Sequence, residues 1–191
     1  MLKDLVFANR SYRGYDESYR FTKEKLMSYD DLTRFTASSV NAQPLKYHIA
    51  YKKDEVDLIQ KMTRWARALP ETELPHKGMC PTGFIIICQD TDISENLARF
   101  QKDIGIVAQT ILLSAVEDNR GGCMIGNFSA DEVKDKLKFS DNIQPMLIIA
   151  LGKPNEKIVI KEIDSGENIN YYRDKNDTHY VPKRKLKDII F

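Results

Sequence analysis

The sequence has few of the features that mark metalloproteins, secreted proteins and membrane proteins. Its three cysteines, Cys80, Cys88 and Cys123, stand far apart and form no C-x-x-C pair, so neither a zinc site nor a dithiol redox centre is indicated. No apolar run is long enough to span a bilayer, and the first residues lack the long apolar stretch of a signal peptide. Free thiols without an export signal favour a reducing cytoplasm, which is the location we expect.

An excess of charge of one sign is also lacking. The chain has 29 Lys and Arg against 28 Asp and Glu, and this formal net charge of +1 gives no overall attraction to nucleic acid. No G-x-G-x-x-G segment and no P-loop occur, so neither a Rossmann nor a Walker site is indicated. With 191 residues, of which 42% are apolar, the chain suits one domain with a full hydrophobic core.

Helical and extended patterns alternate along the first 154 residues. The predicted helices lie at 2–9, from about 30 to 36, at 54–67, at 94–119 and from 129, and the predicted strands at 44–51, 83–89, 123–125 and 144–151. Three prolines between residues 69 and 81 predict a surface loop. This alternation of strands and helices predicts a layered α/β or α+β domain.

The chain changes character after Asn155. Residues 161–180 are polar and charged without a clear period, and the whole stretch 155–191 has no obvious core of its own. Loops of this length are uncommon inside compact domains, so the simplest arrangement is a tail that wraps a second subunit. The sequence therefore predicts a dimer.

Two polar segments near the start could bind a ligand, and each also has a simpler interpretation. Arg10-Ser11-Tyr12-Arg13 offers two guanidinium groups and a hydroxyl, which suit a phosphate, although basic residues near a terminus are often only solvated. Ser38 to Pro44, between a helix and a strand, carries amides that can read a heterocycle edge or a polyol chain. The same residue types also form ordinary turns.

Glycines and basic residues characterise two later segments. Gly121 to Phe128 could let a ligand approach the backbone and its N–H groups, or it could simply stop a helix and begin a strand. Val181 to Lys185 could be a second phosphate clamp or a solvated face. We expect Cys123 to be a buried thiol and none of the three histidines to be catalytic.

In this order and spacing, the four segments resemble the nitroreductase family of FMN-dependent oxidoreductases. The family pattern opens with R-S-x-R, here Arg10 to Arg13, and continues with S-x-x-N-x-Q-P, here Ser38 to Pro44. Its central helix is similar to Asp103–Gln109, and its glycine-rich stretch ends like Ile125-Gly126-Asn127-Phe128. The tail from Tyr172 to Arg184 is typical of one bacterial branch, so the resemblance covers nearly the whole chain.

The resemblance implies one α+β nitroreductase-like domain over residues 1–191. A mostly antiparallel central sheet flanked by helices would form a core of about residues 1–154, and a C-terminal tail of about residues 155–191 would embrace a partner subunit. Two such chains would form a homodimer with an FMN in each of two interface sites. No nucleic acid, membrane or metal is expected to take part.

Carried over motif by motif, the expected FMN contacts come from both ends of the chain. The phosphate and ribityl end should be held by Arg10, Ser11, Arg13, Lys183 and Arg184. The ring and ribityl chain should be contacted by Ser38 from the partner subunit, by Asn41 and Gln43, and by the backbone of Gly126 and Asn127, which would offer a donor near flavin N5. Two positions depart from the family pattern, Asn9 in place of an arginine and Leu45 in place of an aromatic residue, and both concern substrate preference.

The function implied by the resemblance is an FMN-dependent NAD(P)H oxidoreductase. A hydride would pass from NADH or NADPH through flavin N5 to an electron-poor acceptor such as a nitroaromatic or a quinone, by ping-pong turnover and without a catalytic side chain. One alternative is a flavoenzyme of the same fold with another reaction (dehydrogenation, dehalogenation or flavin fragmentation), for which residues 65–82 would be the substrate lid. The other is an FMN-binding dimer that is not an enzyme.

Overall fold

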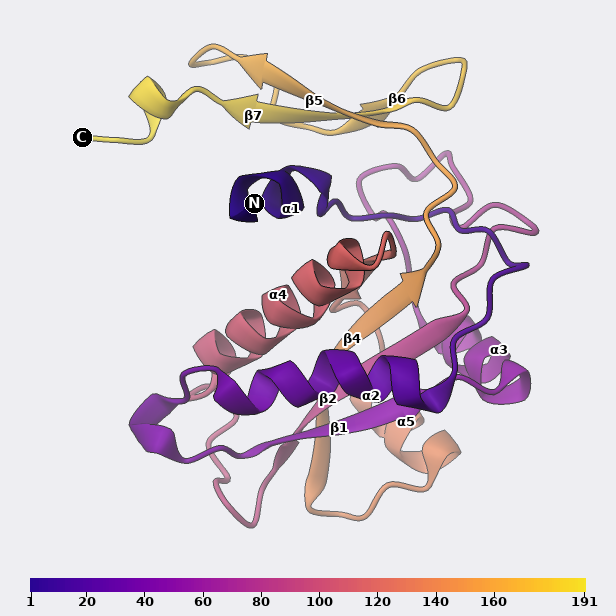
Figure 1. The fold of residues 1–191 in the computed structure, drawn as a ribbon, viewed down its shortest axis with the longest axis vertical. Helices are drawn as coiled ribbons and strands as arrows, with labels where there is room; N and C mark the ends of the chain where they lie inside the picture. The colour runs from indigo at the N-terminus through magenta and orange to yellow at the C-terminus, as the bar shows by residue number, and fades with distance from the viewer.

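Four antiparallel strands form the centre of the computed structural model, which describes residues 1–191 (Figure 1). In the order of the sheet they are β1 (Leu45–Ala50), β2 (Gly83–Asp90), β4 (Ile143–Gly152) and β3 (Gly121–Ile125). The central strand β2 is buried along nearly its whole length, which explains its continuous apolar run. Its register pairs Ile85 with Ile149 and Phe84 with Ala150 of β4.

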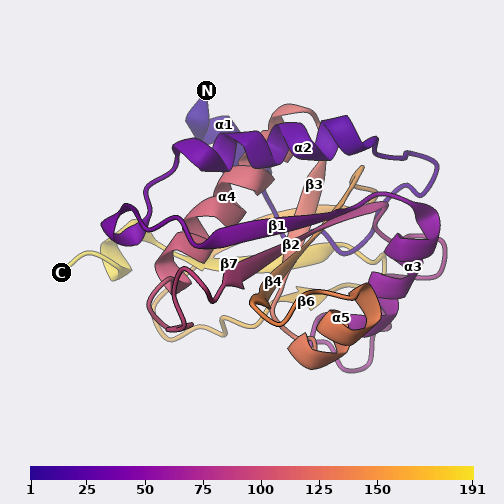
Figure 2. The ribbon, with the colours of Figure 1, turned by 90° about the horizontal axis from the view of Figure 1, so that it is seen from below.

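Helices cover both faces of this sheet (Figure 2). On one face, α2 (Lys23–Asp31) and α4 (Gln101–Glu117) share a core with Ile85 and Ile87. On the other, α3 (Lys53–Met62) and α5 (Ala130–Leu137) pack around Phe84 and Ile86. Alternate residues of β2 therefore point into two separate cores, and the predicted α+β fold with a mostly antiparallel central sheet is confirmed.

Short elements complete the main body. The first helix, α1 (Leu2–Ala8), packs against α4, and none of its residues is buried. Single turns of 3₁₀ helix occur at η1 (Leu32–Phe35), η2 (Ser39–Asn41) and η3 (Leu186–Asp188). No helix in the structure is both long and apolar enough to cross a membrane.

The tail forms a second, three-stranded sheet that the sequence did not predict. It contains β5 (Ile158–Ile163), β6 (Tyr172–Arg173) and β7 (His179–Arg184), in the order β5-β7-β6. β7 runs parallel to β5 and antiparallel to β6. This sheet lies over α1 at one end of the molecule, as Figure 1 shows, and the chain then continues outward to its C-terminus.

Helix ends differ from the predicted ones for local reasons. The helix predicted over 54–67 ends at Met62, where Thr63 turns extended and its hydroxyl donates to the Gln60 carbonyl. The long helix predicted from residue 94 starts only at Gln101, since the Asn96 side chain accepts from two backbone N–H groups and holds a turn.

The helix predicted from about residue 30 starts earlier than expected. It begins at Lys23, because the Thr22 hydroxyl accepts from the Lys25 backbone N–H and caps the first turn. The α-helix then ends at Asp31, and the residues predicted to continue it form η1 instead. The aspartates at this point therefore end the helix rather than begin it.

One carboxyl group near the end of α2 should make the stability of the fold depend on pH. Both side-chain oxygens of Asp30 are buried without a hydrogen-bond partner, and this burial raises the pKa of Asp30 to about 7. Between pH 4 and 7 the unfolded chain ionises while the folded carboxyl stays neutral, so the free energy of unfolding falls as the pH rises. Asp30→Asn should therefore stabilise the protein by about 4 kcal/mol at pH 8 and have little effect at pH 4.

Urea unfolding at pH 4, 6 and 8 measures this effect. Asp31→Asn is the matched control, because Asp31 is exposed and pairs with Arg34 on the surface, where such a pair contributes little. If Asp30→Asn gave the same stability difference at all three values of pH, the raised pKa would be wrong.

Candidate functional site

The Arg10–Arg13 segment is attached to the edge of the central sheet. Beyond α1, the Tyr12 N–H donates to the Gly122 carbonyl over 3.1 Å, and Ser11 forms a parallel bridge with Gly122 of β3. A side chain at Gly122 would collide with the Ala150 carbonyl of β4. Because Gly122 has no side chain, β3 can pair closely with its neighbour β4 and accept the Arg10–Arg13 segment on its free edge.

Four of the ten predicted site residues line one hollow at the junction of this segment and the tail. We call it the basic hollow; its volume is about 300 Å³ and it is lined by Asn9, Arg10, Ser11, Arg13, Gln109, Leu112, Met124, Tyr171, His179, Val181 and Lys183. It contains Arg10, Ser11, Arg13 and Lys183 of the predicted set and no acidic residue. Chain ends far apart in the sequence thus converge on one positively charged concavity.

Buried polar atoms around the basic hollow have no partner in the protein. Arg10 Nε and both ring nitrogens of His179 are buried without a hydrogen bond, although such groups are normally satisfied. Burial lowers the pKa of His179 to about 4, and the positive charges of Arg13 and Arg173 act in the same direction. The imidazole is therefore neutral at neutral pH and can donate one hydrogen bond and accept another.

Arg13 is held in place by the tail. Its guanidinium carbon lies 4.9 Å from the centre of the Tyr171 ring, a cation–π arrangement. Its backbone N–H donates to Glu156, and Glu156 also forms a buried ion pair with Arg173. No carboxylate pairs with the Arg13 guanidinium itself, so its charge remains available to a ligand.

A second hollow adjoins the first along β3. This strand hollow, of about 370 Å³, is lined by Arg13, Arg64, Trp65, Ala66, Arg67, Cys123, Met124, Ile125, Gly126, Asn127 and Tyr171. It shares Arg13, Met124 and Tyr171 with the basic hollow, and it contains the predicted Gly126 and Asn127. A side chain on Gly126 would meet nothing within 4 Å, so the backbone here is open to a ligand.

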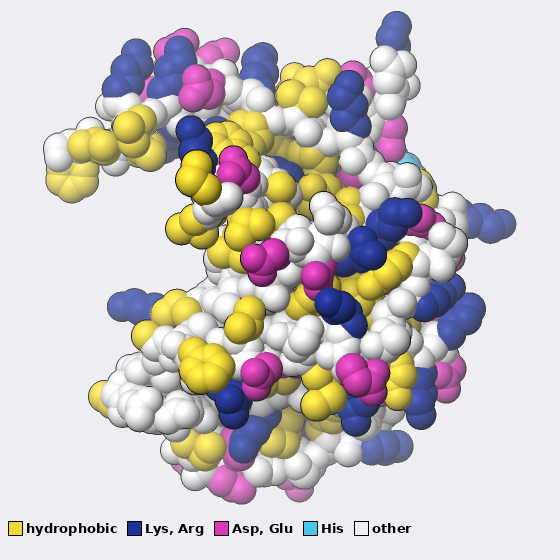
Figure 3. Space-filling model, viewed as in Figure 1, with side chains coloured by type: hydrophobic (Ala, Val, Ile, Leu, Met, Phe, Trp, Pro, Cys, Tyr) yellow, Lys and Arg dark blue, Asp and Glu magenta, His cyan; other side chains and the backbone are white.

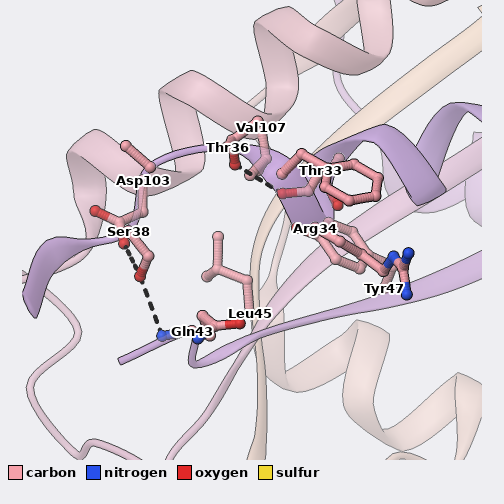
Figure 4. A pocket seen from close by; sticks show the side chains of 11 residues that line it. Thr33, Arg34, Thr36, Ser38, Gln43, Leu45, Tyr47, Asp103 and Val107 are labelled. Carbon is pink, nitrogen blue, oxygen red and sulfur yellow. Dashed lines mark hydrogen bonds between the residues drawn. The ribbon is translucent and has the colours of Figure 1, made fainter. Parts of the chain in front are cut away.

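Ser38 and Gln43 lie in a third hollow that shares no residue with the other two (Figure 4). Ser38 Oγ donates to Asp103 Oδ2 over 2.7 Å and accepts from the Gln43 backbone N–H over 3.0 Å. Asn41 and Gln43 have φ angles of 56° and 50°, and the Gln43 amide donates to Asn41 Oδ1 over 3.1 Å. Asp103, at the start of α4, thus fixes the turn that presents these amides.

A single chain does not bring the ten predicted residues together. Arg184 is exposed and lines none of these three hollows, whereas Lys183 lines the basic one. The sequence reasoning also missed Tyr171, whose side chain borders both adjoining hollows, and it assigned no binding role to His179. No pattern in the sequence signals either residue, because their positions depend on the pairing of β7 in the tail sheet. Cys123 is buried, as expected.

Comparison with known proteins identifies the family. The model of the nitroreductase family matches residues 7–153, which is most of the 191-residue chain, and the chain therefore belongs to this family. A nitroreductase family protein from Streptococcus pneumoniae has a similar structure, with a TM-score of 0.72 at 15% identity and coverage of 100% of this chain and 99% of that one.

Two other solved structures share the fold. A protein from Parabacteroides distasonis, provisionally assigned as an NADH dehydrogenase/NAD(P)H nitroreductase, gives a TM-score of 0.66 at 21% identity, with 91% of this chain and 96% of that chain covered. An FMN-dependent nitroreductase from Clostridium difficile gives 0.64 at 19% identity, with coverage of 80% and 87%. Both likenesses concern the fold.

Proposed function

We propose that the protein is an FMN-dependent oxidoreductase that carries a hydride from NADH or NADPH to an electron-poor acceptor, such as a nitroaromatic or a quinone, by ping-pong turnover. Membership of the nitroreductase family supports an oxidoreductase, and the Clostridium difficile protein of the same fold is FMN-dependent by name. The observation that carries the proposal is the basic hollow, in which Arg10, Ser11, Arg13 and Lys183 converge without an acidic residue.

The residues around the two adjoining hollows fit FMN chemically. Paired guanidinium groups and a serine hydroxyl suit a phosphate, and Lys183 adds a point charge, with Arg184 next to it as a further candidate. The unsatisfied nitrogens of His179 suit a ligand oxygen or hydroxyl. We assign Gly126 and Asn127 to the flavin ring, because their backbone is open beside Arg13. The flavin supplies the hydride chemistry when bound, and the protein's part is to bind it and set its electrostatic surroundings.

The site also requires a second copy of the chain in this proposal. Ser38, Asn41 and Gln43 lie away from the basic hollow of their own chain, so we assign them to the FMN of the partner subunit. Apolar side chains gather beside the indentation between the tail and the main body (Figure 3). The exposed apolar residues of α1 and the C-terminal segment include Leu2, Val6, Phe7, Leu186, Ile189, Ile190 and Phe191. We propose that a homodimer covers this surface, with residues 155–191 of one domain embracing the other chain.

Replacing Arg10 tests the assignment of the phosphate. Arg10→Ala should raise the dissociation constant for FMN about ten- to a hundredfold, because it removes a charge-assisted contact to the phosphate. Titration of the apoprotein with FMN, followed by flavin fluorescence, measures this. Lys52→Ala removes an exposed charge beside α3 and should leave the constant unchanged. Equal FMN affinity in the two variants would refute the phosphate role of Arg10.

The redox assignment has its own experiment. The FMN-loaded protein should lose its yellow colour when NADH or NADPH is added anaerobically, and it should recover the colour when a nitroaromatic or quinone follows. A protein that kept its colour would be a flavin-binding dimer rather than an NAD(P)H oxidoreductase.

A further inference from the structure

A short segment after α3, Arg64–Arg67, forms one wall of the strand hollow. The Arg64 backbone N–H donates to the Asn127 carbonyl over 3.0 Å, which ties the segment to the end of β3. Ala66 has a φ of 44°, in the left-handed region that a residue with a β-carbon seldom adopts. The backbone therefore places this segment directly beside the residues that we assigned to the flavin ring.

The strand hollow has a strongly one-sided charge. Arg13, Arg64 and Arg67 line it, no aspartate or glutamate does, and none of the three arginines forms an ion pair anywhere in the structure. The guanidinium of Arg13 is stacked on Tyr171, whereas those of Arg64 and Arg67 make no side-chain hydrogen bond. These two arginines are available to bind an anion that enters the hollow.

Aromatic surfaces complete the wall. Trp65 lies between the two arginines in the sequence, and its indole N–H donates to the Thr63 hydroxyl over 2.9 Å, which fixes the ring. Tyr171 borders the same hollow. A flat aromatic molecule can pack on such side chains while its charged substituent pairs with a guanidinium fork.

We propose that Arg64 and Arg67 select electron-poor aromatic acceptors that carry a carboxylate. This inference rests on the proposed function and adds the class of substrate to it. The arginines bind the carboxylate of the acceptor, and the ring packs against Trp65 in the same hollow. Neutral acceptors lack the anion and are bound less tightly.

A pair of matched nitro compounds measures this selectivity. The ratio of kcat/KM for 4-nitrobenzoate to that for 4-nitrobenzamide is determined with the FMN-loaded protein and saturating NADH. In the double variant Arg64→Gln/Arg67→Gln this ratio should fall about tenfold, since two charge-assisted contacts are lost. Arg20→Gln is the matched control, because Arg20 is exposed and lines none of the three hollows. It should leave the ratio unchanged.

Binding can be followed without turnover, because Trp65 is the only tryptophan in the chain. Quenching of its fluorescence by 4-nitrobenzoate gives a dissociation constant for protein with or without FMN, after correction for absorption with free tryptophan. The double variant should weaken this binding about tenfold relative to Arg20→Gln. Failure of the protein to bind FMN would contradict the proposed function. The titration would then still test, in the protein without FMN, whether Arg64 and Arg67 bind the carboxylate.

Two outcomes would overturn the inference. One is an unchanged ratio and unchanged quenching by 4-nitrobenzoate in the double variant. The other is a double variant in which flavin reduction by NADPH becomes slower, while flavin reduction by NADH and the binding of 4-nitrobenzoate are unchanged. That result would assign the two arginines to the extra phosphate of the dinucleotide instead of to an aromatic acid.

Discussion

Replacing Glu156 with alanine should detach the tail from the main body and disrupt the basic hollow at the same time. The side chain of Glu156 is 1% exposed and pairs with that of Arg173, which is 6% exposed. Glu156 also accepts the backbone N–H of Arg13. Its removal leaves a buried guanidinium with only the half-exposed Asp177 as partner and leaves a peptide N–H unsatisfied. The expected loss in free energy of unfolding is about 3 kcal/mol.

Urea unfolding gives the stability of this variant, and limited proteolysis reports the state of the tail. Glu162→Ala is the control, since Glu162 lies in the same sheet on β5 but is exposed. Glu156→Gln keeps an acceptor for the Arg13 N–H, so its free energy of unfolding should lie between those of the wild type and Glu156→Ala. Wild-type stability and a protease-resistant tail in Glu156→Ala would show that this buried pair does not attach the tail.

The central sheet could be predicted from the sequence because its pattern reflects burial alone. The predicted strands at 83–89 and 144–151 are confirmed as β2 and β4, whose apolar runs suit strands that are covered by helices. The apolar spacing of α4 predicted a core helix for the same reason. Its start could not be predicted, because a single asparagine side chain holds the preceding turn.

The tail sheet could not be predicted, since its order comes from pairing between distant segments. β5 runs parallel to β7, and Pro182 in β7 argues against a strand when the sequence is considered alone. The proline is tolerated because β6 pairs only with His179 and Tyr180, which leaves one side of β7 free at residue 182. The same pairing places His179 and Lys183 at the basic hollow, so the tail's side of that hollow depends on contacts that no local pattern encodes.

The four motifs predict a larger site than one chain brings together, and the role of their residues in binding FMN stays a prediction. Arg10, Ser11, Arg13 and Lys183 meet as the resemblance implied, and Gly126 and Asn127 adjoin them. No motif marks the side of the site that we propose for the acceptor. The hydrogen bond from the Arg64 N–H to the Asn127 carbonyl and the bridge between Thr63 and Phe128 place the segment after α3 beside them.

Gly122→Ala should be among the most damaging single substitutions in the main body. A methyl group at this position would collide with the carbonyl oxygen of Ala150 and would lie 2.8 Å from Leu112 Cδ2 and 2.9 Å from Leu151 Cδ2. The carbonyl belongs to the neighbouring strand β4 and cannot move without separating β3 from it. We expect a loss of about 3 kcal/mol or more in the free energy of unfolding.

Two other glycines separate this packing effect from the general properties of glycine. Gly126→Ala lies at the end of the same glycine-rich stretch and meets nothing within 4 Å, so it should leave stability nearly unchanged. Gly105→Ala, on the exposed side of α4, should raise stability by about 0.5–1 kcal/mol, because alanine is the better helix former. If Gly122→Ala unfolded at the same urea concentration as Gly126→Ala, the close contact of β3 with β4 would be refuted. The sequence suggested that this glycine-rich stretch admits a ligand. In the structure the backbone is open at Gly126, whereas Gly122 is required by the close pairing of the sheet that carries the Arg10–Arg13 segment.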